Sequence, residues 1–289
     1  MVVSFSGTFL AVDWGTTNRR VFLVEGGQVV RTERDDRGVT SVGDFAAEAA
    51  GIRERFGDLP MLMAGMVGSN IGWQAAPYVP APAGIEDLAA KLLRIDDRTA
   101  IVPGVSVMGP ADVMRGEEVQ LLGAVAAGLV PGDSLLAQPG THCKWAEMEG
   151  GRIAGFTTAM TGELFALLRK YGLLSSQLSD EVTPGRAFLD GVEEGRKRDL
   201  AASLFGIRAA KLLGERADTD AASYASGLLI GSDVAARLER VGHDEVHILA
   251  DRMLGGLYVA AIEAHGRRAV LVDSHAAFIA GIIAIGRIS

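Results

Sequence analysis

The sequence predicts an α/β protein with two similar lobes, and three observations support this. Three short β-prone segments and a segment with helical spacing of apolar residues occupy residues 8–56, and the same β-β-β-α order returns at residues 134–171. In both places a Gly-Thr pair lies in the turn between the first two strands. The 37 glycines fall between apolar runs without a fixed period, which is typical of an α/β enzyme with tight loops.

The first lobe is predicted to open with an antiparallel meander, followed by a helix at 44–56 that ends at Gly57. A second helix at 116–127 is closed by Gly128. Residues 65–83 form a loop rich in Gly, Pro and aromatic residues, too long to be a mere connection. We expect substrate contacts there, from Ser69, Asn70 and Trp73. The predicted strands are 8–12, 21–24, 28–33, 60–65 and 99–103.

The second lobe repeats this order and then becomes mostly helical at 173–240. Its first helix, 162–171, has Thr161 as the expected N-cap and Gly172 as its stop. No charged linker or low-complexity segment separates the halves, so we expect lobes at 1–125 and 126–289 with a cleft between them. The remaining predicted strands are 134–138, 143–147, 152–157, 245–250 and 269–272, and the remaining helices are 255–265 and 275–285.

Composition excludes several classes of protein. Lys and Arg number 28 against 36 Asp and Glu, a net charge of −8, and 48% of residues are hydrophobic, which excludes a disordered tail and a nucleic-acid coat. The longest nearly uncharged apolar stretch, 276–285, is shorter than the roughly 20 residues of a membrane-spanning helix. The single cysteine, Cys143, excludes an internal disulfide. We expect a cytoplasmic protein that binds neither nucleic acid nor a membrane; a homodimer is compatible with the sequence.

The motif with the most specific chemistry is Asp13-x-Gly15-Thr16-Thr17-x-Arg19, between two predicted strands. Gly15 lets the turn approach a phosphate, and the hydroxyl and backbone N–H groups of the threonines can bind its oxygens. Asp13 at the strand end can hold Mg²⁺. An ordinary hairpin would explain the motif equally well if it stood alone. Its pattern, however, resembles the first phosphate motif of the actin/hexokinase superfamily.

A second turn, Pro139-Gly140-Thr141, has the spacing and setting of that superfamily's second phosphate motif. The resemblance implies two ribonuclease-H-like lobes of the actin/hexokinase type, with both turns facing one nucleotide across an interlobe cleft. Sugar kinases of the superfamily carry their catalytic carboxylate between the two motifs, at the start of a helix. Asp112, Glu117 and Glu118 occupy that position here. A solvated first helical turn is the alternative interpretation of these charges.

Longer strings resemble one family, the 2-dehydro-3-deoxygalactonokinases. They are Asp112-Val-Met-Arg-Gly-Glu-Glu-Val-Gln-Leu-Leu-Gly, Pro139-Gly-Thr-His-Cys-Lys-Trp, Phe156-Thr-Thr-Ala-Met-Thr-Gly-Glu-Leu-Phe, Gly227-Leu-Leu-Ile-Gly and Met63-Ala-Gly-Met-Val-Gly-Ser. The resemblance implies phosphorylation of the terminal hydroxyl of 2-dehydro-3-deoxygalactonate by ATP and Mg²⁺. It implies that Asp13, Thr16 and Thr17 serve metal and phosphates, and that Gly140 and Thr141 form the second phosphate loop.

An acidic chain that binds an anionic nucleotide and a sugar acid must gather positive groups locally. Arg19 and Arg20 are candidates for the nucleotide, and Arg115 or Lys144 for the substrate carboxylate. In each case the alternative is an ion pair with a neighbouring carboxylate that braces the fold. His142 is a candidate donor to a phosphate or sugar oxygen, or a local hydrogen-bonder. Trp73 and Trp145 either wall the sugar site or pack in the core.

Two residues depart from the family pattern. Cys143 stands where we expect serine, which would weaken a ligand contact made by that hydroxyl. Ala250 stands where we expect a glycine in the adenosine motif, and its Cβ would stand nearer the nucleotide. The sequence therefore indicates adenine contacts in this region less clearly than it indicates phosphate contacts. Gly227 and Gly231 are expected as loop residues near the nucleotide, with a helix end as the alternative. The rival functions are a kinase of the same fold for another sugar or sugar acid, and a nucleotide-binding regulator without transfer activity.

Overall fold

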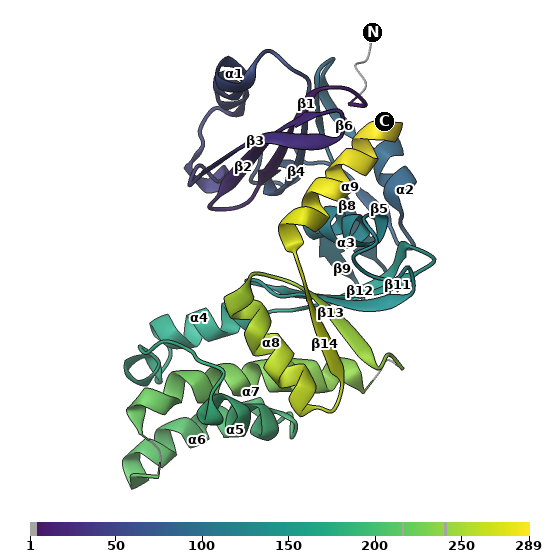
Figure 1. Cartoon of the computed structure of the whole chain (residues 1–289). Helices are drawn as coiled ribbons and strands as arrows, with labels where there is room; N and C mark the ends of the chain where they lie inside the picture. Colours follow the sequence, from purple (N-terminus) through teal and green to yellow (C-terminus); the bar gives the residue numbers. More distant parts are fainter. Residues whose placement is uncertain (1–4, 216, 240–241) are drawn as a thin grey trace. The chain divides into compact units, whose positions relative to one another are not determined.

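The computed structural model describes residues 5–215, 217–239 and 242–289 (Figure 1). They form a mixed α/β protein, as predicted. Contacts divide the chain into two units. Unit 1 comprises Met1–Asp133, Ala146–Phe156 and Ser274–Ser289, and unit 2 comprises Ser134–Trp145 and Thr157–Asp273.

Unit 1 is built on a six-stranded sheet of order β3-β2-β1-β4-β7-β6. The first three strands form the predicted antiparallel meander, and β4 and β7 continue the sheet parallel to β1. In this register Asp13 lies opposite Arg20 on one side and Ala64 on the other. The strands are β1 (Phe9–Trp14), β2 (Arg19–Glu25), β3 (Gln28–Asp35), β4 (Met61–Gly65), β6 (Leu93–Asp96) and β7 (Thr99–Ile101).

Helices cover both faces of this sheet. On one face lies α1 (Phe45–Phe56), capped by the Asp44 side chain, and it buries Ile52 in the core of this face. On the other face lies α9 (Ser274–Ile288), whose Phe278 ring is 5.7 Å from the ring of Phe22. The other helices are α2 (Ile85–Ala90) and α3 (Glu117–Ala126), and a small sheet contains β5 (Tyr78–Pro80), β8 (Gly104–Val107) and β9 (Asp112–Met114).

The units differ from the predicted division in three segments, because 126–133, 146–156 and Ser274–Ser289 group with unit 1. The third difference has a clear cause in the packing of α3 against α9. A Cβ atom on Gly123 of α3 would stand 1.9 Å from the Ala277 carbonyl oxygen. The absence of a side chain at Gly123 therefore lets the last helix lie directly on α3.

Unit 2 contains most of a five-stranded sheet of order β12-β11-β10-β13-β14, and its three last-named strands are parallel. The β-β-β-α repeat predicted from sequence is therefore present in both sheets. Its strands are β10 (Ser134–Gln138), β11 (Cys143–Glu149), β12 (Arg152–Ala159), β13 (Glu245–Leu249) and β14 (Arg268–Val272). Its helices are α4 (Thr161–Tyr171), α5 (Arg186–Gly195), α6 (Leu200–Leu213), α7 (Asp218–Leu238) and α8 (Arg252–Ala264).

The expectation that Gly227 and Gly231 lie in a nucleotide-binding loop is wrong. Both lie within α7, where they contact the backbone of α5. A Cβ atom on Gly227 would stand 2.0 Å from the Phe188 carbonyl oxygen, and one on Gly231 would stand 2.5 Å from that of Val192. The two glycines serve close helix packing, because no larger residue would let the helices approach this far.

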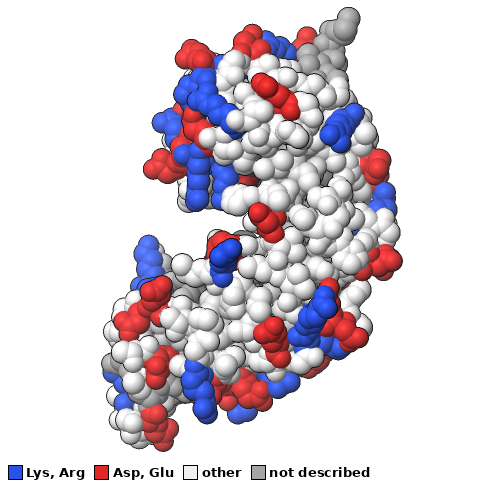
Figure 2. Space-filling view, in the orientation of Figure 1, with Lys and Arg blue, Asp and Glu red and all other residues white. Residues whose placement is uncertain are grey.

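Charged residues of both signs are mixed on the surface drawn in Figure 2. Ion pairs account for part of this mixing in unit 1, where Arg37 pairs with Glu48 and Arg55 pairs with Glu33 at 2.8 Å. Among the described residues, no helix combines the length and the apolar character needed to cross a bilayer.

Candidate active site

The carboxyl ends of β1 and β4 place Asp13 beside the first predicted phosphate turn. Asp13 is the penultimate residue of β1, and its Oδ2 atom lies 3.4 Å from the Arg20 guanidinium. Burial raises the pKa of Asp13 above its ordinary value, while the charges of Arg20 and His275 lower it. His275 lies in the first turn of α9, so a helix N-terminus also lies near this carboxylate. Ligands of α/β sheets bind at this kind of edge.

The turn after Asp13 is held by its carbonyl oxygens, which leaves its side chains at the surface. The Gly38 N–H donates to the Thr17 oxygen at 3.2 Å, and the Thr40 hydroxyl donates to the Thr16 oxygen at 2.9 Å. Thr16 and Thr17 are exposed, and Gly15 has space beside it except for the Asn18 oxygen, 3.3 Å from an added Cβ. The turn is thus fixed from behind, with both threonine side chains at the surface.

The expectation that Arg19 binds the nucleotide is contradicted, because its guanidinium braces the fold. Arg19 is 1% exposed and pairs with Asp35 at 2.7 Å and with Glu48 at 2.9 Å. It also lies 4.8 Å from the centre of the Trp14 ring. Strand alternation explains this: Arg19 faces α1 with Trp14, whereas Arg20 faces Asp13.

The acidic segment between the two phosphate turns reaches the same sheet edge through Gly116. An added Cβ on Gly116 would stand 3.1 Å from the Cα atom of Gly65, the last residue of β4. Glu117 begins α3 immediately after Gly116, and its Oε2 accepts a hydrogen bond from the Arg115 N–H at 3.1 Å. Asp112 begins β9, at the end of that strand away from Gly116, and its Oδ1 accepts from the Val113 N–H.

Glu118, the third candidate carboxylate of this segment, is fully buried behind Glu117. Both of its carboxylate oxygens lie within 2.8 Å of the Gly116 nitrogen. Burial, together with the neighbouring charge of Glu117, raises the pKa of Glu118 to about 8. Periodicity gives the only sequence signal for this burial, since Glu118 lies one turn before the buried Leu121 and Leu122.

Arg115 presents unused hydrogen-bond donors beside this segment. Its Nη2 donates to the Ala76 oxygen at 2.8 Å, and its guanidinium carbon lies 4.4 Å from the centre of the Tyr78 ring. Its Nε and Nη1 atoms are buried and have no partner within the described part of the chain. A guanidinium with open donors is suited to an anionic ligand.

In the loop predicted to contact substrate, two of the three candidate residues make contacts that stabilise the fold. The Ser69 hydroxyl donates to the Met66 oxygen at 2.7 Å and accepts from the Ile71 N–H. Trp73 stacks on Phe45 at 6.3 Å and packs against the core of unit 1, as the core interpretation expected. Asn70 is exposed.

In unit 2 the second phosphate turn rests on the start of α4. The Glu163 N–H donates to the Thr141 oxygen at 2.8 Å, and an added Cβ on Gly162 would stand 2.3 Å from the Gly140 oxygen. His142 is the exposed partner of Glu163, with 2.6 Å between Nε2 and Oε2. The local hydrogen-bonding interpretation expects such a contact, and a ligand contact of His142 stays a prediction.

The side chains that follow this turn point into unit 2. Lys144 is buried, and its Nζ donates to the Thr158 hydroxyl at 2.9 Å. Cys143 is fully buried in the core of unit 2, so the departure from serine lies away from the surface of the turn. Trp145 is a core residue of the same cluster rather than a wall of a sugar site. Ala250, the other departure, packs against this core.

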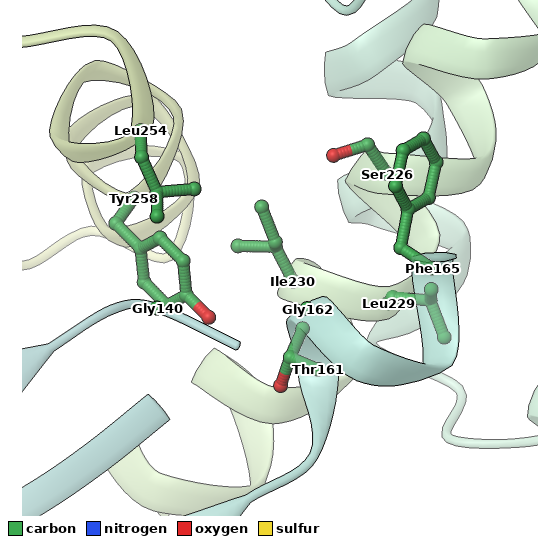
Figure 3. Close-up of a pocket in the computed structure, with 9 residues that line it drawn as sticks. All are labelled: Gly140, Thr161, Gly162, Phe165, Ser226, Leu229, Ile230, Leu254 and Tyr258. Carbon is green, nitrogen blue, oxygen red and sulfur yellow. The ribbon is translucent and has the colours of Figure 1, made fainter. Parts of the chain in front are cut away.

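A pocket of about 70 Å³ opens beside Gly140 within unit 2 (Figure 3). Most of its wall is apolar, and the hydroxyls of Thr161, Ser226 and Tyr258 add polar groups. Figure 3 shows the Ser226 hydroxyl turned toward the space between α8 and the side chains of α4 and α7. Sequence reasoning missed these residues, because helices far apart in the chain supply them. The lining residues are Gly140, Thr161, Gly162, Phe165, Ser226, Leu229, Ile230, Leu254 and Tyr258.

A family model described as 2-keto-3-deoxy-galactonokinase matches residues 13–285. The Escherichia coli (strain K12) protein named 2-dehydro-3-deoxygalactonokinase is 37% identical over 286 residues, which cover 96% of this chain and 97% of that protein. A crystal structure of a Sinorhizobium meliloti protein, provisionally assigned as a 2-dehydro-3-deoxygalactonokinase, is 35% identical with a TM-score of 0.91. The match covers 96% of this chain and 98% of that one.

A more distant likeness concerns the fold alone. An activator of 2-hydroxyisocaproyl-CoA dehydratase from Clostridium difficile, solved with bound ADPNP, has a TM-score of 0.50 at 11% identity. The match covers 96% of this chain and 93% of that one. The predicted fold class, an α/β protein of the actin/hexokinase type with a ribonuclease-H-like sheet in each half, is confirmed.

Proposed function

The chain belongs to the 2-keto-3-deoxy-galactonokinase family, and from this premise we propose that it transfers the γ-phosphoryl group of ATP to the terminal hydroxyl of 2-dehydro-3-deoxygalactonate, giving the 6-phosphate. The observation that supports this most directly is the meeting of three features at one sheet edge. Asp13 is the penultimate residue of β1, the exposed threonine turn follows this strand, and Gly116 brings Glu117 against the end of β4. A kinase needs a metal ligand, phosphate donors and a proton acceptor.

Glu117 is the proposed general base. It begins α3 at the sheet edge and is partly exposed, so a substrate hydroxyl can reach its carboxylate. Glu118 is fully buried, which removes it from contact with a substrate. Asp112 lies at the far end of β9. Glu117 accepts the proton of the attacking hydroxyl as the oxygen–phosphorus bond forms, and ADP leaves with the electrons of the broken bond.

Magnesium fits the donor set around Asp13. Mg²⁺ is usually held by one or two carboxylates together with water and phosphate oxygens. Within the described residues no group of three His, Cys, Asp or Glu side chains gathers, and Asp13 offers the single carboxylate that this mode needs. When bound, the ion neutralises charge on the phosphate oxygens. The adjoining turn orients the phosphates through Thr16 and Thr17.

Unit 2 carries its own proposed nucleotide contacts. Gly140 and Thr141 bind phosphate oxygens, and the pocket beside Gly140 receives the adenosine. Phe165 and Leu254 offer apolar walls for a planar base, while the Ser226 and Tyr258 hydroxyls can bind its polar edge or the ribose.

Arg115 is the proposed anchor of the substrate carboxylate. Its Nε and Nη1 donors are buried and unbonded among the described residues, so each N–H group is available to a carboxylate oxygen. Lys144 already donates to Thr158 inside unit 2 and is less suited to this role. Contacts of Asn70 and His142 with the sugar hydroxyls remain predictions. We further propose that the enzyme acts in the cytoplasm, where ATP is supplied.

The test is ADP release measured with a panel of 2-keto-3-deoxy sugar acids and neutral hexoses. The proposal expects turnover with 2-dehydro-3-deoxygalactonate at least about 100-fold above that with any neutral hexose, because Arg115 binds the carboxylate. Turnover on neutral hexoses alone would indicate a kinase of the same fold with another substrate. Nucleotide binding without ADP release from any compound would indicate a regulator.

A further inference from the structure

A buried carboxylate in the middle of α7 has no part in the reaction described above. Asp233 is 8% exposed, and its Oδ2 accepts hydrogen bonds from Trp145 Nε1 and from the Thr161 hydroxyl, each at 3.1 Å. Arg237, one helical turn later, places its Nε 3.7 Å from Oδ1. Burial raises the pKa of Asp233, while the hydrogen bond from Trp145 and the charge of Arg237 lower it.

The groups bound to Asp233 come from three other elements of unit 2. Trp145 lies on β11, Thr161 opens α4, and Tyr258, which also hydrogen-bonds Asp233, lies on α8. Thr161 was expected to cap α4, but it is the first residue of that helix and its hydroxyl binds Asp233 instead. Asp233 therefore joins β11, α4 and α8 to α7 at one point.

Two of these partners also line the nucleotide pocket. Thr161 and Tyr258 are both part of its wall (Figure 3). The residues after Thr161 hold the second phosphate turn, because Gly162 contacts the Gly140 oxygen and the Glu163 N–H bonds the Thr141 oxygen. A shift of the Thr161 side chain would thus reach the phosphate turn through the start of α4.

Stability alone does not explain a carboxylate here. Burying a charge is costly, and a packed apolar side chain of similar size often stabilises a core equally well or better. The surroundings of Asp233 are otherwise apolar, since Val234 and Ile230 on the same helix belong to the core of unit 2. A shared acceptor, by contrast, fixes the direction of several donors at once.

We propose that Asp233 is a positioning residue for nucleotide binding, which holds Thr161 and Tyr258 in place around the pocket and thereby sets the second phosphate turn. This inference rests on the proposed function for the identity of the ligand, a magnesium–adenine nucleotide. Asp233 acts through Thr161 and Tyr258 and does not touch the nucleotide itself.

The experiment compares Asp233→Ala, Asp233→Asn, Thr161→Val and the control Val234→Ala in the full chain. Val234 is fully buried on the same helix, so its truncation lowers stability without removing a donor or acceptor of the network. The Kd for MgADP is measured by calorimetry, and KM for ATP, KM for the sugar acid and kcat by ADP release. Thermal unfolding shows that each variant is folded at the assay temperature.

Asp233→Ala is expected to raise the Kd for MgADP and KM for ATP about tenfold, the size of one lost charge-assisted hydrogen bond. KM for the sugar acid and kcat stay near those of the wild type, and Val234→Ala leaves all four constants unchanged. Asp233→Asn restores part of the affinity, because its amide oxygen still accepts from one donor. Thr161→Val weakens MgADP binding, and a variant that combines Asp233→Ala with Thr161→Val binds no more weakly than Asp233→Ala alone.

Equal Kd values for MgADP in Asp233→Ala and Val234→Ala would overturn the proposal. Should Asp233→Ala not fold, the Kd values of Asp233→Asn and Thr161→Val decide the question, and wild-type affinity in both overturns it. Failure of the proposed function would give a different result in the ADP-release assay. The wild type would then release no ADP with any sugar acid, while the calorimetric comparison would still report on Asp233.

Discussion

The backbones of Gly65 and Gly116 touch at the sheet edge, where a methyl group on Gly116 would stand 3.1 Å from the Gly65 Cα atom. Both glycines have positive φ values, +95° and +105°, which side-chain-bearing residues rarely adopt. The contact places Glu117 next to the end of β4 and hence near Asp13 on the neighbouring strand. The contact between Gly65 and Gly116 thus brings the proposed base, Glu117, close to the proposed metal ligand, Asp13.

Replacement of Gly116 by alanine tests this contact. We expect a loss of at least about 1 kcal/mol in the free energy of unfolding, from the strained φ and the crowded Cβ, and a fall in kcat of about 10- to 100-fold as Glu117 shifts. Steady-state kinetics and thermal unfolding measure the two effects. Gly128→Ala is the control, since Gly128 also has a positive φ but an added Cβ meets nothing within 4 Å. Equal kcat values for the two variants would contradict the role of the contact.

Glu117→Gln removes the proposed base and keeps its size. We expect kcat to fall about 10²- to 10⁴-fold, because proton transfer to a placed carboxylate is lost, with little change in the Kd for MgADP. Single-turnover kinetics with calorimetry provides both values. Asp112→Asn is the matched control and should keep near-normal turnover. A larger loss in Asp112→Asn than in Glu117→Gln would assign the base to Asp112.

Glu118 makes stability depend on pH in a defined direction. Its pKa is about 8 in the folded protein against an ordinary value of 4.5, so between these values the folded protein holds a proton that the unfolded chain has lost. The free energy of unfolding therefore falls as pH rises from about 4.5 to about 8, by at most about 1.4 kcal/mol per pH unit from this group, and levels off above.

Glu118→Gln should remove this dependence. The Tm of the variant relative to the wild type is expected to rise steadily between pH 5 and pH 8 and then to stay constant. Scanning calorimetry at four pH values measures the difference. The control is Glu147→Gln, since Glu147 is exposed on β11. A Tm difference that is the same at pH 5 and pH 8 would show that the Glu118 carboxyl group is not kept neutral by its surroundings.

Asp13→Asn tests the proposed metal ligand. The amide lacks the negative charge that Mg²⁺ prefers, so we expect kcat to fall at least about 100-fold and the Mg²⁺ concentration for half-maximal activity to rise. A magnesium titration of ADP release measures both. Asp58→Asn serves as the control, because Asp58 is an exposed partner of Arg98 in the same unit. An unchanged magnesium titration curve in Asp13→Asn would rule out a role for Asp13 in metal binding.

Local sequence patterns predict the strands and most helices of this fold, because apolar spacing and glycine turns act within a few residues. The meander that contains Asp13 and its repeat before Thr161 are of this kind. Helix starts are less predictable where a cap is subtle: α8 begins at Arg252 rather than at residue 255, since Asp251 accepts hydrogen bonds from the Met253 and Leu254 N–H groups.

Features that depend on distant parts of the chain could not be predicted from local patterns. Nothing near Gly227 in the sequence indicates that α5 packs against it, and the ion pairs of Arg19 are formed with residues of β3 and α1. The pocket beside Gly140 needs α4, α7 and α8 together. The turns and the acidic segment were found because each is continuous in the sequence, whereas Asp233 connects elements that only the fold brings together.

Direct identification of the product tests the central proposal most sharply. The wild-type chain is incubated with ATP, Mg²⁺ and 2-dehydro-3-deoxygalactonate, and phosphorus NMR with mass spectrometry locates the transferred group. We predict one phosphate ester on the terminal carbon for each ADP formed, and its loss in Glu117→Gln. ADP formation without a phosphorylated sugar acid, or an ester at another carbon, would contradict the account.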